Sequence, residues 1–421
     1  MEWRIGIIPL PVLVVLLGII GYFVRADALP TEICMMMAVI ATGGFICAEI
    51  GKRIPGVRSI GGAAIFATFI PSALVYYDLL PATIVKSVRD FTRSTNFLYL
   101  FIAAIIVGSI LSMDRNVLVR GFIKIFVPLA AGSVLALLVG TAVGTALGLG
   151  ARHTLLFVII PIMAGGVGEG AIPLSMGYAS VLHQNQGELF AMVLPPVMFG
   201  SLTAILFAGV LNLVGKKYPA LTGEGRLQPG AQEDVDPVHE EIKPHMDVEQ
   251  IASAGMFAIS LYLAGLFVHQ AWDFPAPVVM LFLAVAVKLA RGVPPATQDG
   301  AHYVYRFFRT AVTYPLLFAI GVAMTPWDKL MDAFHWKNLI TIVATVSTLM
   351  GTGFFVGRWI RLFPIEAAIV NACHSGQGGT GDVAILTAAN RMPLMPFAQI
   401  ATRIGGAITV TATLLILRAL G

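Results

Sequence analysis

Charged side chains are scarce in this chain of 421 residues. Asp, Glu, Lys and Arg together make up 12% of it and hydrophobic residues 57%, whereas a typical soluble domain carries about 25% charged residues. This balance excludes a water-soluble globular protein. The net charge of +4 comes without a dense basic run, so we expect no nucleic-acid partner. The composition indicates an integral membrane protein surrounded by lipid.

Sequence patterns typical of enzymes and metalloproteins are also missing. The three cysteines, Cys34, Cys47 and Cys373, lie in apolar stretches without a CxxC pair, so they indicate neither a disulfide framework nor a zinc site. A P-loop, an HExxH motif and a dinucleotide fingerprint followed by an acidic residue are absent from the sequence. Histidine does not occur at catalytic spacing from a Ser or Cys nucleophile. We therefore expect no catalytic residues and no organic cofactor.

Apolar runs recur along the chain at lengths close to the roughly 20 residues that cross a bilayer. The first run is too long for a signal peptide and lacks a small-residue cleavage site, so residues 1–30 are interpreted as a retained extra helix. Eleven transmembrane helices are predicted: Ile7–Phe23, Thr31–Ile50, Ser59–Tyr77, Phe97–Met113, Phe122–Leu149, Leu189–Val214, Ile251–Trp272, Val278–Ala290, Thr310–Met324, Asn338–Ile360 and Leu394–Leu417.

Two glycine-rich octapeptides interrupt further apolar stretches. GGVGEGAI at Gly165–Ile172 returns as GGTGDVAI at Gly378–Ile385. Glycine breaks helices because it loses the most backbone entropy on ordering, and a membrane tolerates broken backbone only where protein or a water-filled cavity covers it. We predict two re-entrant hairpins, 154–180 and 364–390, with a substrate between them, as in secondary transporters.

Loop charges predict how the chain is oriented, since short cytoplasmic loops are rich in Lys and Arg. The Lys and Arg residues are more frequent in the inner loops if the N-terminus lies in the cytoplasm and the C-terminus outside. Lys288 and Arg309 then belong to one inner loop. Asp78–Asn96 breaks the rule and is interpreted as an amphipathic interfacial helix. Residues 31–214 and 250–421 then form an inverted repeat of two five-helix halves, joined by a polar cytoplasmic linker, 215–249.

Arg403 is the strongest candidate for binding an organic anion. It lies within the last apolar span, where a charge is costly without a partner, and its guanidinium presents a planar fork to a carboxylate. A structural ion pair with Glu169, Asp382 or Glu366 is the alternative.

The tips of the two predicted hairpins are candidates for binding both substrate and ion. Their backbone N–H groups suit a carboxylate, and their freed carbonyls suit sodium. The alternative interpretation of the glycines is close packing of helices through small residues.

Three other ionisable side chains near the hairpins have more than one interpretation. Glu169 and Asp382 follow the two tips directly and are candidates for binding sodium, for carrying a coupling proton or for capping half-helices. Arg391 is predicted to be an interfacial anchor. His374 is predicted to be a hydrogen-bonded histidine rather than a proton relay.

The chain resembles the 2-hydroxycarboxylate transporters, which include bacterial sodium-coupled citrate and malate symporters. The likeness is carried by EIGKRIP from Glu49, STNFLYLFIA from Ser94, FPIEAAI from Phe363 and NRMPLMPFAQIATRIGGAI from Asn390. It implies eleven helices with two oppositely oriented hairpins, a homodimer in the bacterial plasma membrane, and elevator-like movement of a transport domain. The alternative function is that of the membrane subunit of a sodium-pumping decarboxylase complex.

The resemblance also implies roles for particular residues. Substrate would contact Gly168, Thr380 and Arg403, together with the tip residues Gly166, Gln377 and Gly379. Sodium, if it is the coupling ion in place of a proton, would lie near Gly168, Cys373, Ser375, Gly376 and Thr402. Citrate-transporting members of the family have Asn at the position of Val167 in this chain and Arg at the position of Gln377. Because one guanidinium is missing, we expect malate to be favoured over citrate.

Overall fold

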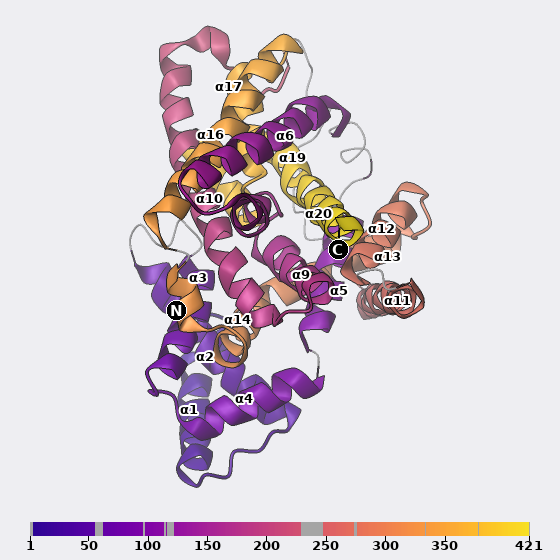
Figure 1. Ribbon diagram of the computed structural model, residues 1–421. Coiled ribbons are helices and arrows are strands. Elements are labelled where there is room, and N and C mark those ends of the chain that lie inside the picture. Colours follow the sequence, from indigo (N-terminus) through magenta and orange to yellow (C-terminus); the bar gives the residue numbers. More distant parts are fainter. Residues whose placement is uncertain are drawn as a thin grey trace.

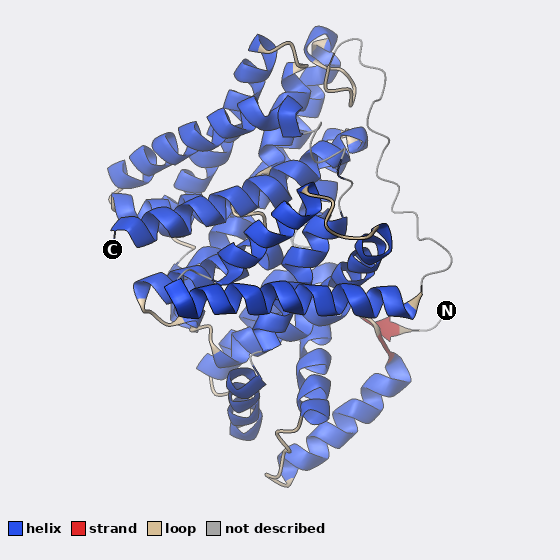
Figure 2. Ribbon diagram, turned by 90° about the vertical axis from the view of Figure 1, so that its right-hand side faces the viewer, coloured by secondary structure: helices blue, strands red, loops and turns tan. Residues whose placement is uncertain are grey.

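The computed structural model describes residues 3–54, 62–95, 97–112, 115, 122–228, 247–272, 276–332, 334–377 and 379–420. Almost all of these residues are helical (Figure 2). The exception is a small antiparallel hairpin of β1, Arg4–Ile5, and β2, Ile8–Pro9. The first helix, α1 Leu10–Arg25, therefore begins three residues later than predicted, and the all-α prediction holds apart from this hairpin.

The helices are those of a multi-pass membrane protein. Within the described residues, six helices are long and apolar enough to cross a bilayer: α2 Ile33–Arg53, α6 from Lys124 to Ala146, α10 Gln186–Lys217, α11 Val248–Trp272, α16 Trp336–Trp359 and the stretch Phe397–Ala419. The bent pair α4 Ala82–Thr95 and α5 Phe97–Ser112 would make a seventh. The other predicted spans are shorter helices: α1, α3 Gly62–Tyr76, α12 Ala276–Leu289 and α14 Thr313–Ala323. The count of eleven crossings stays a prediction.

Both glycine-rich stretches form pairs of short helical arms. In the first stretch, the first arm consists of α7 Ala151–His153, η3 Thr154–Ile159 and α8 Ile160–Ile162, and the second arm of η4 Val167–Ala171 and α9 Ile172–Leu182. They run side by side, since the Tyr178 hydroxyl donates to the carbonyl oxygen of Leu156 at 2.9 Å. The second pair is α17 Pro364–Cys373 and α18 Gly379–Ala389. We refer to each pair as a hairpin. That the two hairpins are re-entrant, and that they enter from opposite membrane faces, stays a prediction.

The helices gather into three groups that do not follow chain order (Figure 1). The first holds α1 to α4 together with α14, and the second packs α5 against α11, α12 and α13 Pro295–Phe307. The third surrounds the hairpins with α6 Phe122–Ala146, α10, α16 and a last helix. This last helix consists of η7 Met392–Leu394, α19 Met395–Gln399, η8 Ile400–Gly405 and α20 Gly406–Leu420. Three short elements remain: η5 Pro219–Leu221, η6 Phe308–Val312 and α15 Trp327–Asp332.

One helix was missing from the prediction. The stretch before Thr310 was expected to be an inner loop, but Pro295–Phe307 forms α13 and continues through η6 into α14. Helix α13 buries one face, on which Ala301, Val304 and Tyr305 recur at helical spacing. Lys288, expected in the same loop, is 3% exposed because its Nζ donates to the carbonyl oxygen of Leu111 at 2.7 Å. Of these residues, Tyr305 belongs to the site described next.

Candidate functional site

The first glycine tip has a backbone that glycine adopts most readily. Gly165 and Gly166 take φ values of 92° and 100°, a region that other residues enter at a steric cost. A Cβ atom on Gly166 would lie 2.7 Å from Cα of Gln377, and one on Gly165 would lie 2.6 Å from the carbonyl oxygen of Thr402. Gln377 belongs to the second tip and Thr402 to η8. The two tips therefore touch each other, and η8 lies against the first tip.

The carboxylate that follows the second tip is completely enclosed. Asp382 is 0% exposed, and its Oδ2 accepts a hydrogen bond from the Thr402 hydroxyl at 2.8 Å. Its Oδ1 is buried and has no hydrogen-bond partner among the described residues. A Cβ on Gly376 would lie 2.6 Å from this oxygen, so the missing side chain leaves the carboxylate room. A buried, half-satisfied carboxylate of this kind can take up a cation or a proton.

Arg403 and the carboxylate of the first tip lie together in the interior. Arg403 is 9% exposed, and its Nε lies 3.8 Å from Oε1 of Glu169. The other Glu169 oxygen, Oε2, is buried and has no hydrogen-bond partner in the described part of the chain. Arg403 stands in η8, a π-helical turn, and such turns are frequent at functional sites. Of the three partners considered for Arg403 from sequence, Glu169 forms the ion pair.

Tyr305 on α13 completes this cluster. Its hydroxyl donates to Oε1 of Glu169 at 3.0 Å and accepts from Nη2 of Arg403 at 3.4 Å. Its ring also faces two guanidinium groups, with the Cζ atoms of Arg403 and Arg309 at 5.0 and 5.8 Å from the ring centroid. Such cation–π contacts are attractive. Sequence reasoning missed Tyr305 and placed Arg309 in a loop; the periodicity of α13 was the available signal.

The residues predicted to contact substrate or sodium are only partly brought together. Cys373, Gly376 and Thr402 lie close to one another, since a Cβ on Gly376 would be 2.8 Å from the Cys373 carbonyl oxygen and 3.2 Å from Cγ2 of Thr402. The Ser375 hydroxyl donates to the Ala372 carbonyl oxygen at 2.7 Å. Gly168 faces α5 instead, with Phe101 3.6 Å from a Cβ built there.

The second tip is described only in part. The Gln377 amide lies against Met198 on α10, with Nε2 2.8 Å from the sulfur. Gly379 and Thr380 begin α18, but the side chain of Thr380 and all of Gly378 lie outside the described residues. Their predicted contacts with substrate therefore stay predictions.

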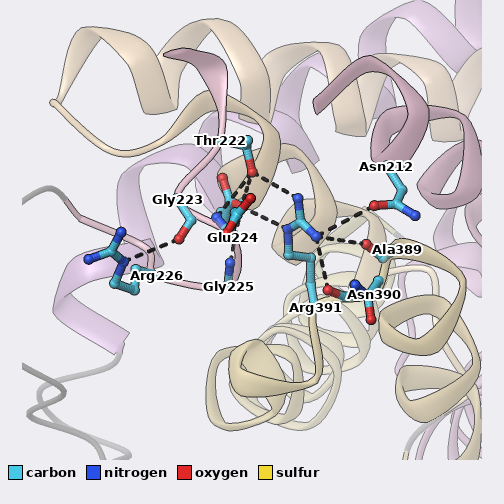
Figure 3. Close-up of polar contacts among 10 residues, drawn as sticks. Asn212, Thr222, Gly223, Glu224, Gly225, Arg226, Ala389, Asn390 and Arg391 are labelled. Carbon is cyan, nitrogen blue, oxygen red and sulfur yellow. Dashed lines mark hydrogen bonds and ion pairs between the residues drawn. The ribbon is translucent and has the colours of Figure 1, made fainter. Parts of the chain in front are cut away.

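A second buried ion pair closes the base of the second hairpin (Figure 3). Nε of Arg391 donates to Oε1 of Glu366 at 3.0 Å, and the Thr222 hydroxyl donates to the same oxygen at 2.6 Å. Arg391 is 5% exposed, so it is not the interfacial anchor predicted from sequence. Because Glu366 pairs here, it is not the partner of Arg403.

The segment after α10 is held by this pair. The Gly225 amide donates to Glu366 Oε1 at 3.3 Å, and Leu227 accepts from the Phe363 amide at 3.0 Å. The first part of the predicted linker, residues 218–228, is therefore folded against the second hairpin. Its residues 229–246 lie outside the described part of the chain.

Buried charges at the meeting point of two broken helices are typical of membrane transporters. The model of the 2-hydroxycarboxylate transporter family matches residues 5–415. The chain belongs to this family, and it is accordingly a transporter and not an enzyme.

Three curated relatives match nearly the whole chain. The citrate/malate-proton symporter of Bacillus subtilis (strain 168) is 59% identical over 420 residues, covering 99% of this chain and 93% of the relative. The Na(+)-malate symporter of the same organism is 38% identical over 417 residues, with coverages of 99% and 93%. The citrate/sodium symporter of Salmonella typhimurium is 31% identical over 399 residues, with coverages of 91% and 88%.

The contact between the tips predicts opposite effects for two glycine substitutions. Gly166→Ala should destabilise the purified protein by about 1–3 kcal/mol, because a Cβ there strains the backbone and meets the Gln377 main chain. Gly255→Ala, inside α11 with nothing near its Cβ position, should stabilise it by about 0.5–1 kcal/mol. Thermal melting measures both. Equal melting temperatures for the two variants would contradict the contact.

Proposed function

We propose that the chain is a symporter that moves malate, and less readily citrate, together with a coupling ion. The observation that carries this proposal is the guanidinium of Arg403, buried where the two glycine tips meet. An organic anion needs such a group inside a membrane, whereas a conduit for cations does not. Relatives named as citrate and malate symporters support the substrate class.

Substrate binding exchanges one carboxylate for another. In the structure Glu169 faces Arg403 at 3.8 Å, which is beyond hydrogen-bonding distance and far from a bidentate fork. A substrate carboxylate that reaches Arg403 directly replaces this long contact with charge-assisted hydrogen bonds, each contributing about 1.5–3 kcal/mol. Backbone N–H groups of the tips bind a second carboxylate.

Proton coupling is the mode that we favour. The binding of a dianion beside Glu169 and Asp382 places like charges together, and protonation of one carboxylate removes that repulsion. The 59% identical relative is named a proton symporter, whereas two more distant relatives are named for sodium. Sodium near Cys373, Gly376 and Thr402 is therefore the second possibility. Either ion would neutralise one of these two carboxylates.

We further propose that residues 31–214 and 250–421 are inverted repeats. The exchange of helices supports this: α14 packs in the first group, whereas α5 packs in the second, and each directly follows an amphipathic helix, α13 or α4. The hairpins with α6, α10, α16 and α20 would move as one body against the other two groups, in a homodimer. The N-terminus lies in the cytoplasm and the C-terminus outside the plasma membrane.

Counterflow of labelled malate in proteoliposomes that contain only this chain tests the proposed function. Wild-type protein should exchange malate without any partner subunit, which the decarboxylase alternative does not allow. Arg403→Ala should lower the rate by at least about 100-fold, because two charge-assisted hydrogen bonds are lost. Arg25→Ala, on the exposed end of α1, is the matched control. Undiminished counterflow by Arg403→Ala would refute the assignment.

We assign the coupling proton to Glu169, the carboxylate that faces Arg403, and this assignment predicts a separation of two activities. Glu169→Gln should retain malate counterflow, because a neutral side chain leaves Arg403 available. It should lose malate accumulation driven by a pH gradient, because the amide carries no proton across. Glu188→Gln, with an exposed side chain in the first turn of α10, should keep both activities. Accumulation that persists in Glu169→Gln, or that follows sodium alone in wild type, argues against proton coupling through Glu169.

Selectivity is predicted to depend on Gln377. Gln377→Arg adds a guanidinium to the second tip, so it should lower the KM for citrate relative to that for malate by about tenfold, as expected from one charged hydrogen bond. Gln184→Arg, in an exposed position after α9, should leave the ratio unchanged. An unaltered ratio in Gln377→Arg would show that another residue determines the preference.

A further inference from the structure

A large groove lies behind the first hairpin, apart from the proposed substrate site. Its volume is about 780 Å³, and α6, the first arm, α9 and α20 line it. Arg403, Glu169, Asp382 and Gln377 do not line it. The walls are mainly aliphatic, so the groove does not suit a small, highly charged acid.

The groove opens toward the membrane. Val134 on α6 is 55% exposed and Ile416 on α20 is 59% exposed, and both line it. The same face of α6 continues in Leu138, which is 63% exposed. In a multi-pass membrane protein, such a continuous apolar face meets acyl chains, so lipid has direct access to the groove.

Polar groups are found at one end of the groove. Arg152, in α7, is exposed and lines the groove. Thr141 also lines it, and its Oγ1 has no hydrogen-bond partner within the residues that the structure describes. A Cβ on Gly144 would lie 2.3 Å from Thr154, so the end of α6 abuts the start of the first arm. Thr141 and Arg152 therefore mark the same end.

The inner end of the groove needs no polar ligand. His374, 1% exposed, lies there with its ring nitrogens 3.2 Å from the Ser133 hydroxyl and 3.4 Å from the Thr409 hydroxyl. The groove thus has a cationic outer end, a long apolar wall and an inner end whose polar groups are already paired. This polarity matches a molecule with one anionic end and one apolar chain.

We propose that the groove binds one anionic phospholipid, with its phosphate at Arg152 and an acyl chain between α6 and α20. Burial of each methylene group and attraction of an anionic headgroup to arginine both favour this occupant. The lipid contacts α9 and α20, the helices that follow the first tip and Arg403. It therefore braces the proposed substrate site from behind without entering it.

Native mass spectrometry of the full-length protein in detergent tests the proposal, with phosphatidylglycerol and phosphatidylcholine of identical chains as probes. Wild type should bind one phosphatidylglycerol about fivefold more tightly than phosphatidylcholine, the ratio expected from one arginine at a charged headgroup. Arg152→Gln should bring the two affinities together. Ala412→Trp, which fills the groove from α20, should abolish binding of both lipids.

Two controls separate this groove from general effects of charge and bulk. Arg25→Gln removes another exposed arginine, and Val210→Trp adds bulk to an exposed face of α10; both should bind lipid as wild type does. Equal affinities of wild type for the two lipids, or full lipid binding by Ala412→Trp, would overturn the proposal. The proposal would also be overturned if Ala412→Trp converted a dimer into a monomer without changing lipid binding, because a second copy of the chain would then occupy the groove. None of these measurements requires transport activity.

Discussion

The contact between two glycine tips is the interaction on which the rest of the site depends. Gly166 lies so close to Gln377 that no Cβ fits between them, and this approach requires the left-handed backbone of the first tip. It brings the two interrupted helices together in the protein interior. The carboxylates after each tip then reach η8, where Thr402 and Arg403 stand side by side. Without the contact these charges would be buried apart and unpaired, at several kcal/mol each.

The charges in this site are only partly satisfied, which suits a carrier. Glu169 and Asp382 each keep one buried oxygen without a hydrogen-bond partner, and the ion pair between Arg403 and Glu169 is long. Tyr305 holds Glu169 from α13, a helix of another group. Glu366 also keeps one buried oxygen without a hydrogen-bond partner among the described residues, but its pair with Arg391 is short and tied to Thr222. The contrast therefore lies in the length of the two ion pairs: the long one suits exchange with a ligand, and the short one fixes the base of a hairpin.

The sequence was informative wherever local chemistry determined the outcome. Repeated glycines predicted the broken helices because other residues enter that backbone region only at a steric cost, and a lone arginine in an apolar span predicted a buried charge, which the structure pairs with Glu169. It was less informative about partners distant in sequence. Tyr305 lies 136 residues from Glu169, and Thr222 lies 144 from Glu366, so no local pattern connects them. The periodicity of α13 was detectable, but several polar residues weakened the apolar signal.

A structure determined with malate bound tests the central claim most directly. The account predicts ligand density between the two tips, with one carboxylate within hydrogen-bonding distance of the Arg403 guanidinium and Glu169 displaced from it. Malate held elsewhere, or bound between the tips with Arg403 still facing Glu169, would contradict the account.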